Sequence, residues 1–273
     1  MEKLIRANAG GDVVLLHRFV REQLTDMQSR NLEDLKNRLN SVGWFVPPYF
    51  SSGLLDTVAL TIARRNGGFT QADLEGVLAR VYTAERLASM VLNRYPQTPV
   101  VMLFAETISE AVMAHFLRLN HVAVGGLIPV VEGAGRRLAT QRGIEPAKQI
   151  KNVFKLLLSD AKTDVVARRI GATDEIVNML DSFLGFIDNY FFTASADYPL
   201  MDRTNRNGIA HGAFTDAEYG RPISFYKTIA AIDFLTFVSS LNTSKLSGFV
   251  PTDTPQSIAL SARYAATASQ SVG

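Results

Sequence analysis

Large apolar residues recur at intervals of three and four along most of this chain, and no long segment alternates apolar with polar residues. That spacing gathers apolar side chains on one face of an α-helix, whereas a half-buried strand needs a period of two. No internal repeat with a fixed period accompanies it. The sequence therefore predicts an all-α protein built as a helical bundle.

Turn and capping residues divide this pattern into helical segments. We expect helices over residues 12–39, 52–65, 70–93, 100–120, 121–142, 146–158, 173–191 and 224–241. Asp12 is a candidate N-cap for the first helix, and Thr70 with Asp73 resembles a capping box for the third. The segment Gly43-Trp44-Phe45-Val46-Pro47-Pro48 cannot continue a helix and is expected to form a buried corner. Pro129 is expected to kink the helix over residues 121–142.

Three regions follow from these breaks. Tyr95-Pro96-Gln97-Thr98-Pro99 separates an N-terminal helical layer over residues 1–95 from a main bundle over residues 100–245. Residues 246–273 are rich in Ser, Ala and Thr and contain few large apolar side chains. We expect that last segment to be a flexible tail.

Composition narrows the chemistry that the chain can perform. It has no cysteine, which excludes disulfides, thiolate metal sites and cysteine nucleophiles and is typical of a reducing compartment. The four histidines lie far apart, without the spacing of a zinc site. The first residues lack the apolar core of a secretory signal, and no apolar stretch is long enough to span a membrane. We expect a cytoplasmic protein that uses no metal or other cofactor.

Positive charge is concentrated between Arg136 and Arg169, where nine Lys or Arg residues accompany three acidic ones, although the whole chain has a net charge of only +2. Such an excess can follow a phosphate backbone. Candidate RNA-binding residues are Arg136, Arg137, Lys148, Lys151 and Lys155. The alternative is a solvated helix face without a partner.

The segment Arg206-Asn207-Gly208-Ile209-Ala210-His211 combines residues suited to phosphodiester chemistry. A guanidinium binds phosphate through two hydrogen bonds, and an imidazole transfers protons near neutral pH. On a helix, Arg206 and His211 flank one edge so that their heads can converge, whereas Asn207 shares the face of His211. Asn207 is therefore expected to hydrogen-bond the histidine or a phosphate oxygen.

This segment resembles the R-x4-6-H ribonuclease motif of the HEPN superfamily. Asn205 to Gly212 is similar to the NRHxxxHG variant found in bacterial and phage helical proteins, with Asn207 in place of its first histidine. The corner at residues 43–48 and the segment Leu127-Ile128-Pro129-Val130-Val131-Glu132-Gly133 are also similar to segments of those proteins.

The resemblance implies a four-helix HEPN core within residues 100–245, preceded by additional N-terminal helices. It also implies a homodimer in which two motifs face each other across a shared cleft. Many members are metal-independent endoribonucleases with toxin, phage-defence or RNA-processing roles. Arg206 and His211 would then be catalytic and Asn207 supporting, although some members keep the fold without the activity.

Several alternatives remain open at this point. Two roles are open for Glu132: it orients one of the arginines Arg206 and Arg136, or it faces solvent. Asp181 and Asp188 likewise lie either near the site or on a solvated face. His211 can instead stabilise a helix C-terminus before Gly212, and His17, His115 and His121 are expected to serve packing. The alternative function is a catalytically inactive helical module that binds a nucleotide, RNA or a protein partner.

Overall fold

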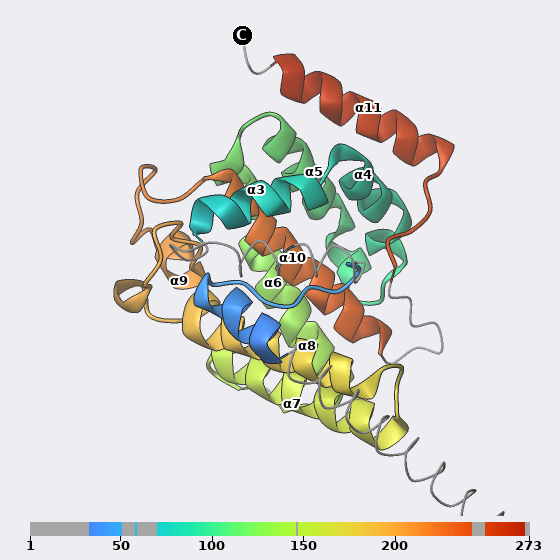
Figure 1. The fold of residues 1–273 in the computed structure, drawn as a ribbon, viewed down its shortest axis with the longest axis vertical. Coiled ribbons are helices and arrows are strands. Elements are labelled where there is room, and N and C mark those ends of the chain that lie inside the picture. Colours follow the sequence, from blue (N-terminus) through green and yellow to red (C-terminus); the bar gives the residue numbers. More distant parts are fainter. Residues whose placement is uncertain (1–32, 51–57, 59–69, 146, 242–248, 271–273) are drawn as a thin grey trace, which may run out of the picture.

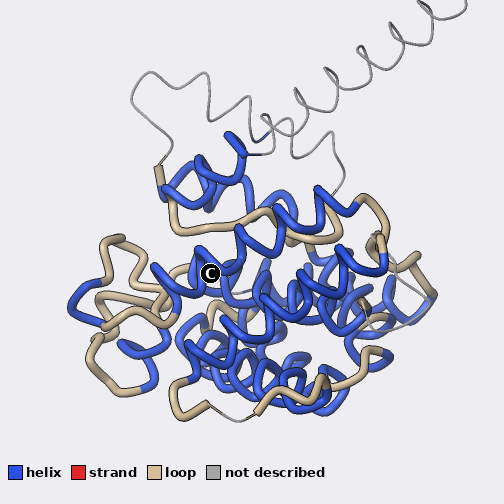
Figure 2. Tube along the Cα trace, turned by 90° about the horizontal axis from the view of Figure 1, so that it is seen from below, coloured by secondary structure: helices blue, strands red, loops and turns tan. Residues whose placement is uncertain are grey.

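The computed structural model describes residues 33–50, 58, 70–145, 147–241 and 249–270. This described part consists of helices and loops and contains no strand (Figures 1 and 2), which confirms the prediction of an all-α protein. The expected N-cap at Asp12, His17, Pro146 and all of the expected helix over residues 52–65 except residue 58 lie outside it.

Helix α10 (Pro222–Ser240) runs through the middle of the molecule in Figure 1. Every residue from Ile223 to Ser240 is buried, so this helix has no solvent-facing side. Pro222 occupies the first turn, where its missing N–H costs no intrahelical hydrogen bond. Helices α6 (Asn120–Gln141) and α3 (Gln71–Val81) pack directly against α10. The other helices form layers around this central element.

Two long helices, α7 (Ile150–Arg168) and α8 (Thr173–Phe186), form the lower layer of Figure 1. Helix α8 continues into a π-helical turn, η3 (Ile187–Phe191). Phe183 of α8 stacks on Phe234 of α10 with ring centroids 4.1 Å apart. The predicted corner is confirmed, because Trp44 and Phe45 are fully buried and Phe45 packs against Phe183.

The upper layer contains α3, α4 (Ala84–Asn93) and α5 (Ala105–Phe116), with the short 3-10 helices η1 (Tyr95–Gln97) and η2 (Val101–Phe104) between α4 and α5. The capping box of Thr70 and Asp73 is confirmed. The single helix expected over residues 70–93 is wrong, because the chain breaks after Val81. Thr83 caps the second helix by accepting a hydrogen bond from the Arg86 amide.

Both ends of one other helix differ from the prediction. Helix α7 begins at Ile150 and extends to Arg168, beyond the expected range of residues 146–158. Buried Ala161 and Val165 continue its apolar face into the more charged second half. Helix α6 agrees with the predicted range to within one residue at each end and includes Pro129.

Residues 255–270 differ from the expected flexible tail, since they form helix α11 (Pro255–Gln270) along the outer side of α4 and α5 (Figure 1). Tyr264 is fully buried and stacks on Phe116 with ring centroids 4.6 Å apart. Ser257 and Ser261 are buried on the same side of α11. Small side chains at helical spacing allow close approach between helices, so this face needs few large apolar residues.

His115 is one of the buried polar residues and serves packing, as predicted. Its ring stacks on Phe225 at 3.9 Å between centroids, and Nδ1 lies 2.8 Å from Oδ1 of Asn120. Burial lowers the pKa of His115 from 6.5 to about 4, since a charged imidazole loses its hydration there. The folded protein therefore contains a neutral ring over much of the acidic range.

We expect His115 to reduce stability as pH falls from 6.5 to about 4. Over that interval the unfolded chain binds a proton at this ring and the folded protein does not, so acid favours unfolding by up to about 3 kcal/mol. The measurement is the free energy of unfolding in urea at several pH values for the wild type and His115→Gln. The stability difference between the two proteins should shrink towards pH 4. A constant difference across that range would contradict the assignment.

Candidate functional site

The predicted motif forms a single helical turn, α9 (Arg206–Ala210), on the surface between η4 (Ser195–Asp197) and α10. Asn205 caps this turn, because its Oδ1 accepts a hydrogen bond of 2.7 Å from the Gly208 amide. The amide group of Asn205 donates to the carbonyl oxygens of Tyr190 and Thr193. Carbonyl groups at the end of a helix lack intrahelical donors. Asn205, which is fully buried, therefore binds an amide at the start of α9 and carbonyl groups at the end of the preceding helical turn at once.

A buried ion pair holds the loop that leads into α9. Lys227 of α10 is fully buried, and its Nζ lies 2.9 Å from Oδ2 of Asp202, which is 1% exposed. Lys227 also donates to the Val42 carbonyl and to Gln71, while the Tyr198 hydroxyl donates to Asp202. Burial lowers the pKa of Lys227, and the adjacent carboxylate opposes that change. The loop before the motif is therefore attached to the central helix.

The heads of Arg206 and His211 meet at the surface. Nη1 of Arg206 lies 2.8 Å from Nε2 of His211, whose side chain is exposed. A guanidinium can only donate, so this contact requires a neutral imidazole whose Nε2 accepts and whose proton is on Nδ1. A neutral imidazole has the protonation state of a general base, and in this structure its Nε2 lone pair is occupied by the Arg206 N–H.

Glu132 of α6 orients Arg206. Its Oε2 accepts from Nε of Arg206 at 2.9 Å and lies 2.7 Å from Nη2, a fork-like arrangement that fixes the guanidinium plane. Its Oε1 accepts from Nε and Nη2 of Arg136 at 3.3 and 3.2 Å. One carboxylate thus binds both arginines. Of the roles left open by the sequence, Glu132 therefore orients Arg206 and Arg136 and does not simply face solvent.

Asn207 contacts neighbours other than those predicted from its spacing. Its Nδ2 donates to the carbonyl oxygens of Thr193 and Phe192, and its Oδ1 accepts from Nη1 of Arg206 at 3.0 Å. The expected side-chain hydrogen bond to His211 is absent, because His211 is the C-cap of α9 and lies outside the helix; the two residues are joined only by the His211 backbone N–H, which donates to the Asn207 carbonyl. Asn207 therefore positions Arg206 against the end of η3.

Most of the basic segment is paired with acidic residues. Asp188 lies 2.6 and 3.0 Å from the ammonium groups of Lys151 and Lys155, and Lys162 lies 2.9 Å from Asp181. These contacts assign structural partners to Asp181 and Asp188. Despite partial burial, the hydrogen bonds from the two lysines lower the pKa of Asp188.

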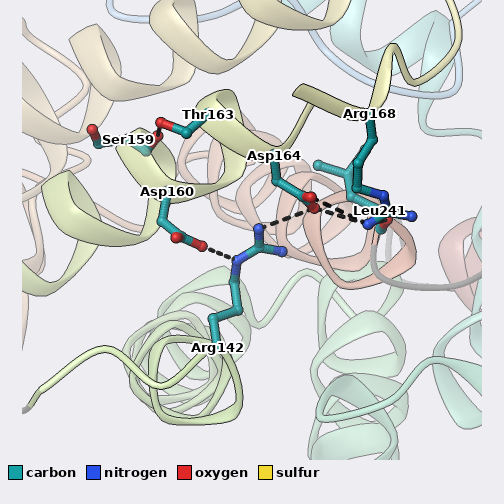
Figure 3. A network of polar contacts seen from close by, with 7 residues as sticks. All are labelled: Arg142, Ser159, Asp160, Thr163, Asp164, Arg168 and Leu241. Carbon is teal, nitrogen blue, oxygen red and sulfur yellow. Dashed lines mark hydrogen bonds and ion pairs between the residues drawn. The ribbon is translucent and has the colours of Figure 1, made fainter. Parts of the chain in front are cut away.

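Arg142 is held in the same way at the end of α6. Figure 3 shows it between Asp160 and Asp164 of α7, with Arg168 on the other side of Asp164. These side chains line an open surface hollow of about 530 Å³. Within the described residues, Arg137 and Lys148 form no ion pair and are exposed, so they remain the candidates best placed for RNA.

The described residues contain no cluster of three or more His, Asp or Glu side chains suited to hold a metal ion. None of their helices is both long and apolar enough to cross a membrane.

No protein-family model, curated protein or solved structure matches this chain. The case for the site therefore depends on its residues and their geometry.

Sequence reasoning gave no positioning role to three residues that hold the site: Asn205, which it named only as part of the motif, Asp202 and Lys227. A lysine within the mainly apolar segment of residues 224–241 was the available signal, because a buried cation requires a buried partner. Its partner, 25 residues earlier, could not be identified from spacing.

We expect Lys227→Met to destabilise the protein by about 3–5 kcal/mol, because the Asp202 carboxylate would remain buried without its cation. Urea denaturation measures the change, with Lys148→Met on the surface as the control, expected to stay within about 0.5 kcal/mol of the wild type. Adding Asp202→Asn to Lys227→Met should recover part of the loss. Equal stability of Lys227→Met and the wild type would show that the pair does not hold this loop.

We expect Gly208→Ala to destabilise α9, because a Cβ at this position would lie 2.1 Å from the Phe214 ring. Such overpacking costs about 1–3 kcal/mol. Gly76→Ala in α3 is the matched control, since its Cβ would meet no atom within 4 Å. Helix propensity predicts that this control gains up to about 1 kcal/mol. The two changes in unfolding free energy should therefore have opposite signs, and equal effects would refute the packing argument.

Proposed function

We propose that this protein is a metal-independent endoribonuclease of the HEPN type, acting on single-stranded RNA through Arg206 and His211. The observation that carries the proposal is the contact of 2.8 Å between Nη1 of Arg206 and Nε2 of the exposed His211. Glu132 supports it by fixing the guanidinium from the opposite side. An oriented cation and a neutral imidazole thus lie side by side where a strand has access.

These groups suit cleavage of a phosphodiester by its own 2′-hydroxyl. When Arg206 turns its Nη1 from His211 to the phosphate, Nε2 of His211 would remove the hydroxyl proton while the 2′ oxygen attacks phosphorus and the bond to the 5′ oxygen breaks. Arg206 would stabilise the negative charge that develops on the phosphoryl oxygens. The products would be a 2′,3′-cyclic phosphate and a free 5′-hydroxyl. Asn207 would act as a positioning residue through its hydrogen bond to Arg206.

The leaving 5′ oxygen needs a proton. A homodimer with two facing motifs, as the resemblance implies, would bring a second histidine to that oxygen, where its protonated imidazolium form would donate the proton. We therefore propose that the active form is a dimer. We also propose a toxin or phage-defence role, in which RNA cleavage halts growth. Protein groups then provide both proton transfers and the charge stabilisation, so the mechanism needs no metal ion.

We expect the purified protein to cleave single-stranded RNA in excess chelator. His211→Ala and Arg206→Ala should each lower the rate by about 100-fold or more, since each removes a group that acts in the transition state. Gel analysis of a labelled RNA pool measures the rate, and detection of 2′,3′-cyclic phosphate ends tests the mechanism. Circular dichroism and thermal melting should show unchanged helicity and stability.

Arg80→Ala on the exposed side of α3 is the control for loss of a positive charge and should cleave like the wild type. If the wild type and both motif variants are equally inert, and equally harmless when expressed, the inactive binding module should replace this proposal. Cleavage that stops in chelator would instead indicate metal-dependent chemistry.

A further inference from the structure

A small cavity opens beside Arg136, one helical turn along α6 from Glu132. Its volume is about 140 Å³, and it is lined by Arg136, Ala139, Thr140, Ile144, Glu145 and Val153. It could hold roughly four or five water molecules at about 30 Å³ each, and it is smaller than the sites of about 300 Å³ or more that take drug-sized ligands. This size suits a single planar ring system.

The cavity is linked to the candidate catalytic pair by direct contacts. Arg136 lines it and donates through Nε and Nη2 to Oε1 of Glu132, whose Oε2 holds Arg206. A helix rises about 1.5 Å per residue, so Arg136 lies about 6 Å along α6 from Glu132. The cavity therefore neighbours the place where a scissile phosphate would lie.

We infer that this cavity binds one nucleobase of the RNA strand whose phosphate lies at Arg206 and His211, and that the base is guanine. The inference rests on the proposed function and names part of its substrate. Recognition of single-stranded RNA commonly stacks an unpaired base on an aromatic ring or an arginine plane and reads its edge by hydrogen bonds. The side chains around this cavity provide both elements.

Arg136 lines the cavity, and in this inference its guanidinium would supply the stacking plane. Its side chain is 41% exposed, and its two hydrogen bonds to Glu132 hold the orientation of the plane. Ala139, Ile144 and Val153 form an apolar wall that suits the face of a base. Because Glu132 partly neutralises Arg136, this arginine is better suited to stacking than to binding a second phosphate.

Glu145 and Thr140 are the other polar residues that line the cavity. A carboxylate only accepts hydrogen bonds, so it favours a base edge that presents donors. Guanine presents two adjacent donors, N1–H and the exocyclic amine, which together match the two oxygens of Glu145. Adenine and cytosine each present one amine beside an acceptor, and uracil presents a single N–H between two carbonyl groups.

The test uses the His211→Ala protein, which should bind RNA without cleaving it. Fluorescence anisotropy would compare labelled uridine octamers in which one central position is G, A, C or U. We expect the G-containing octamer to bind about tenfold more tightly than the others, the discrimination typical of one bidentate contact. Adding Glu145→Gln should reduce this preference to within about twofold. Glu175→Gln, an exposed substitution on α8, should preserve it.

Arg136→Lys separates stacking from charge, because lysine keeps the positive charge without the plane. We expect this variant to bind all four octamers more weakly and to keep the salt dependence of binding. Equal affinity for the four octamers, retention of the G preference in Glu145→Gln, or no measurable binding would each overturn the inference.

The outcome is separable from that of the proposed function. If the wild type does not cleave RNA but His211→Ala prefers G through Glu145, the cavity is a nucleotide site and only the proposed ribonuclease activity fails. If the wild type cleaves at all positions equally and binding shows no preference, only the base-binding inference fails.

Discussion

The buried ion pair between Lys227 and Asp202 is the interaction on which the arrangement of the site depends. Helix α10 is enclosed on every side, so a charged side chain on it must find its partner inside the protein. Lys227 finds Asp202 in the loop before α9 and also binds the Val42 carbonyl and Gln71. A single ammonium group thereby joins the central helix to three other segments, including the one that carries the motif.

A second buried charge on α10 connects the upper layer in the same way. Asp233 accepts hydrogen bonds from the hydroxyl groups of Tyr82 and Tyr95, and Arg86 lies 3.8 Å from it. Burial raises the pKa of Asp233, and burial together with this carboxylate raises the pKa of both tyrosines. The guanidinium of Arg86 also lies over the rings of Phe50 and Tyr82. Polar groups on α10 thus determine where the surrounding helices dock.

This anchoring explains how a helix of five residues and its C-cap can hold the side chains of Arg206 and His211 in fixed positions. An isolated helix of this length is unstable, because the first turn fixes several dihedral angles for one hydrogen bond. Here Asn205 and Asn207 bind carbonyl groups at the end of η3, and Glu132 of α6 holds Arg206. The geometry of Arg206 and His211 is therefore a property of three elements that meet, and α9 alone would not maintain it.

Local features of the chain were predictable from the sequence by itself. Apolar spacing determined the all-α class, the residues of the capping box set the start of α3, and Trp44 and Phe45 marked a buried corner. The five-residue interval between Arg206 and His211 also made their convergence predictable. Each of these depends on residues close together in the chain, where helical geometry leaves few alternatives.

Tertiary structure alone decided which groups each side chain meets. Glu132 and Arg206 are 74 residues apart, and Asn207 binds carbonyl groups 14 and 15 residues before it. Asp188 and Asp181 pair with lysines of α7 because α7 and α8 pack side by side. Helix α11 docks through Ser257, Ser261 and Tyr264. Two of these three side chains are small and polar, so the sequence shows no apolar face there. These contacts arise from how helices cross, and residue spacing within one segment carries no information about that crossing.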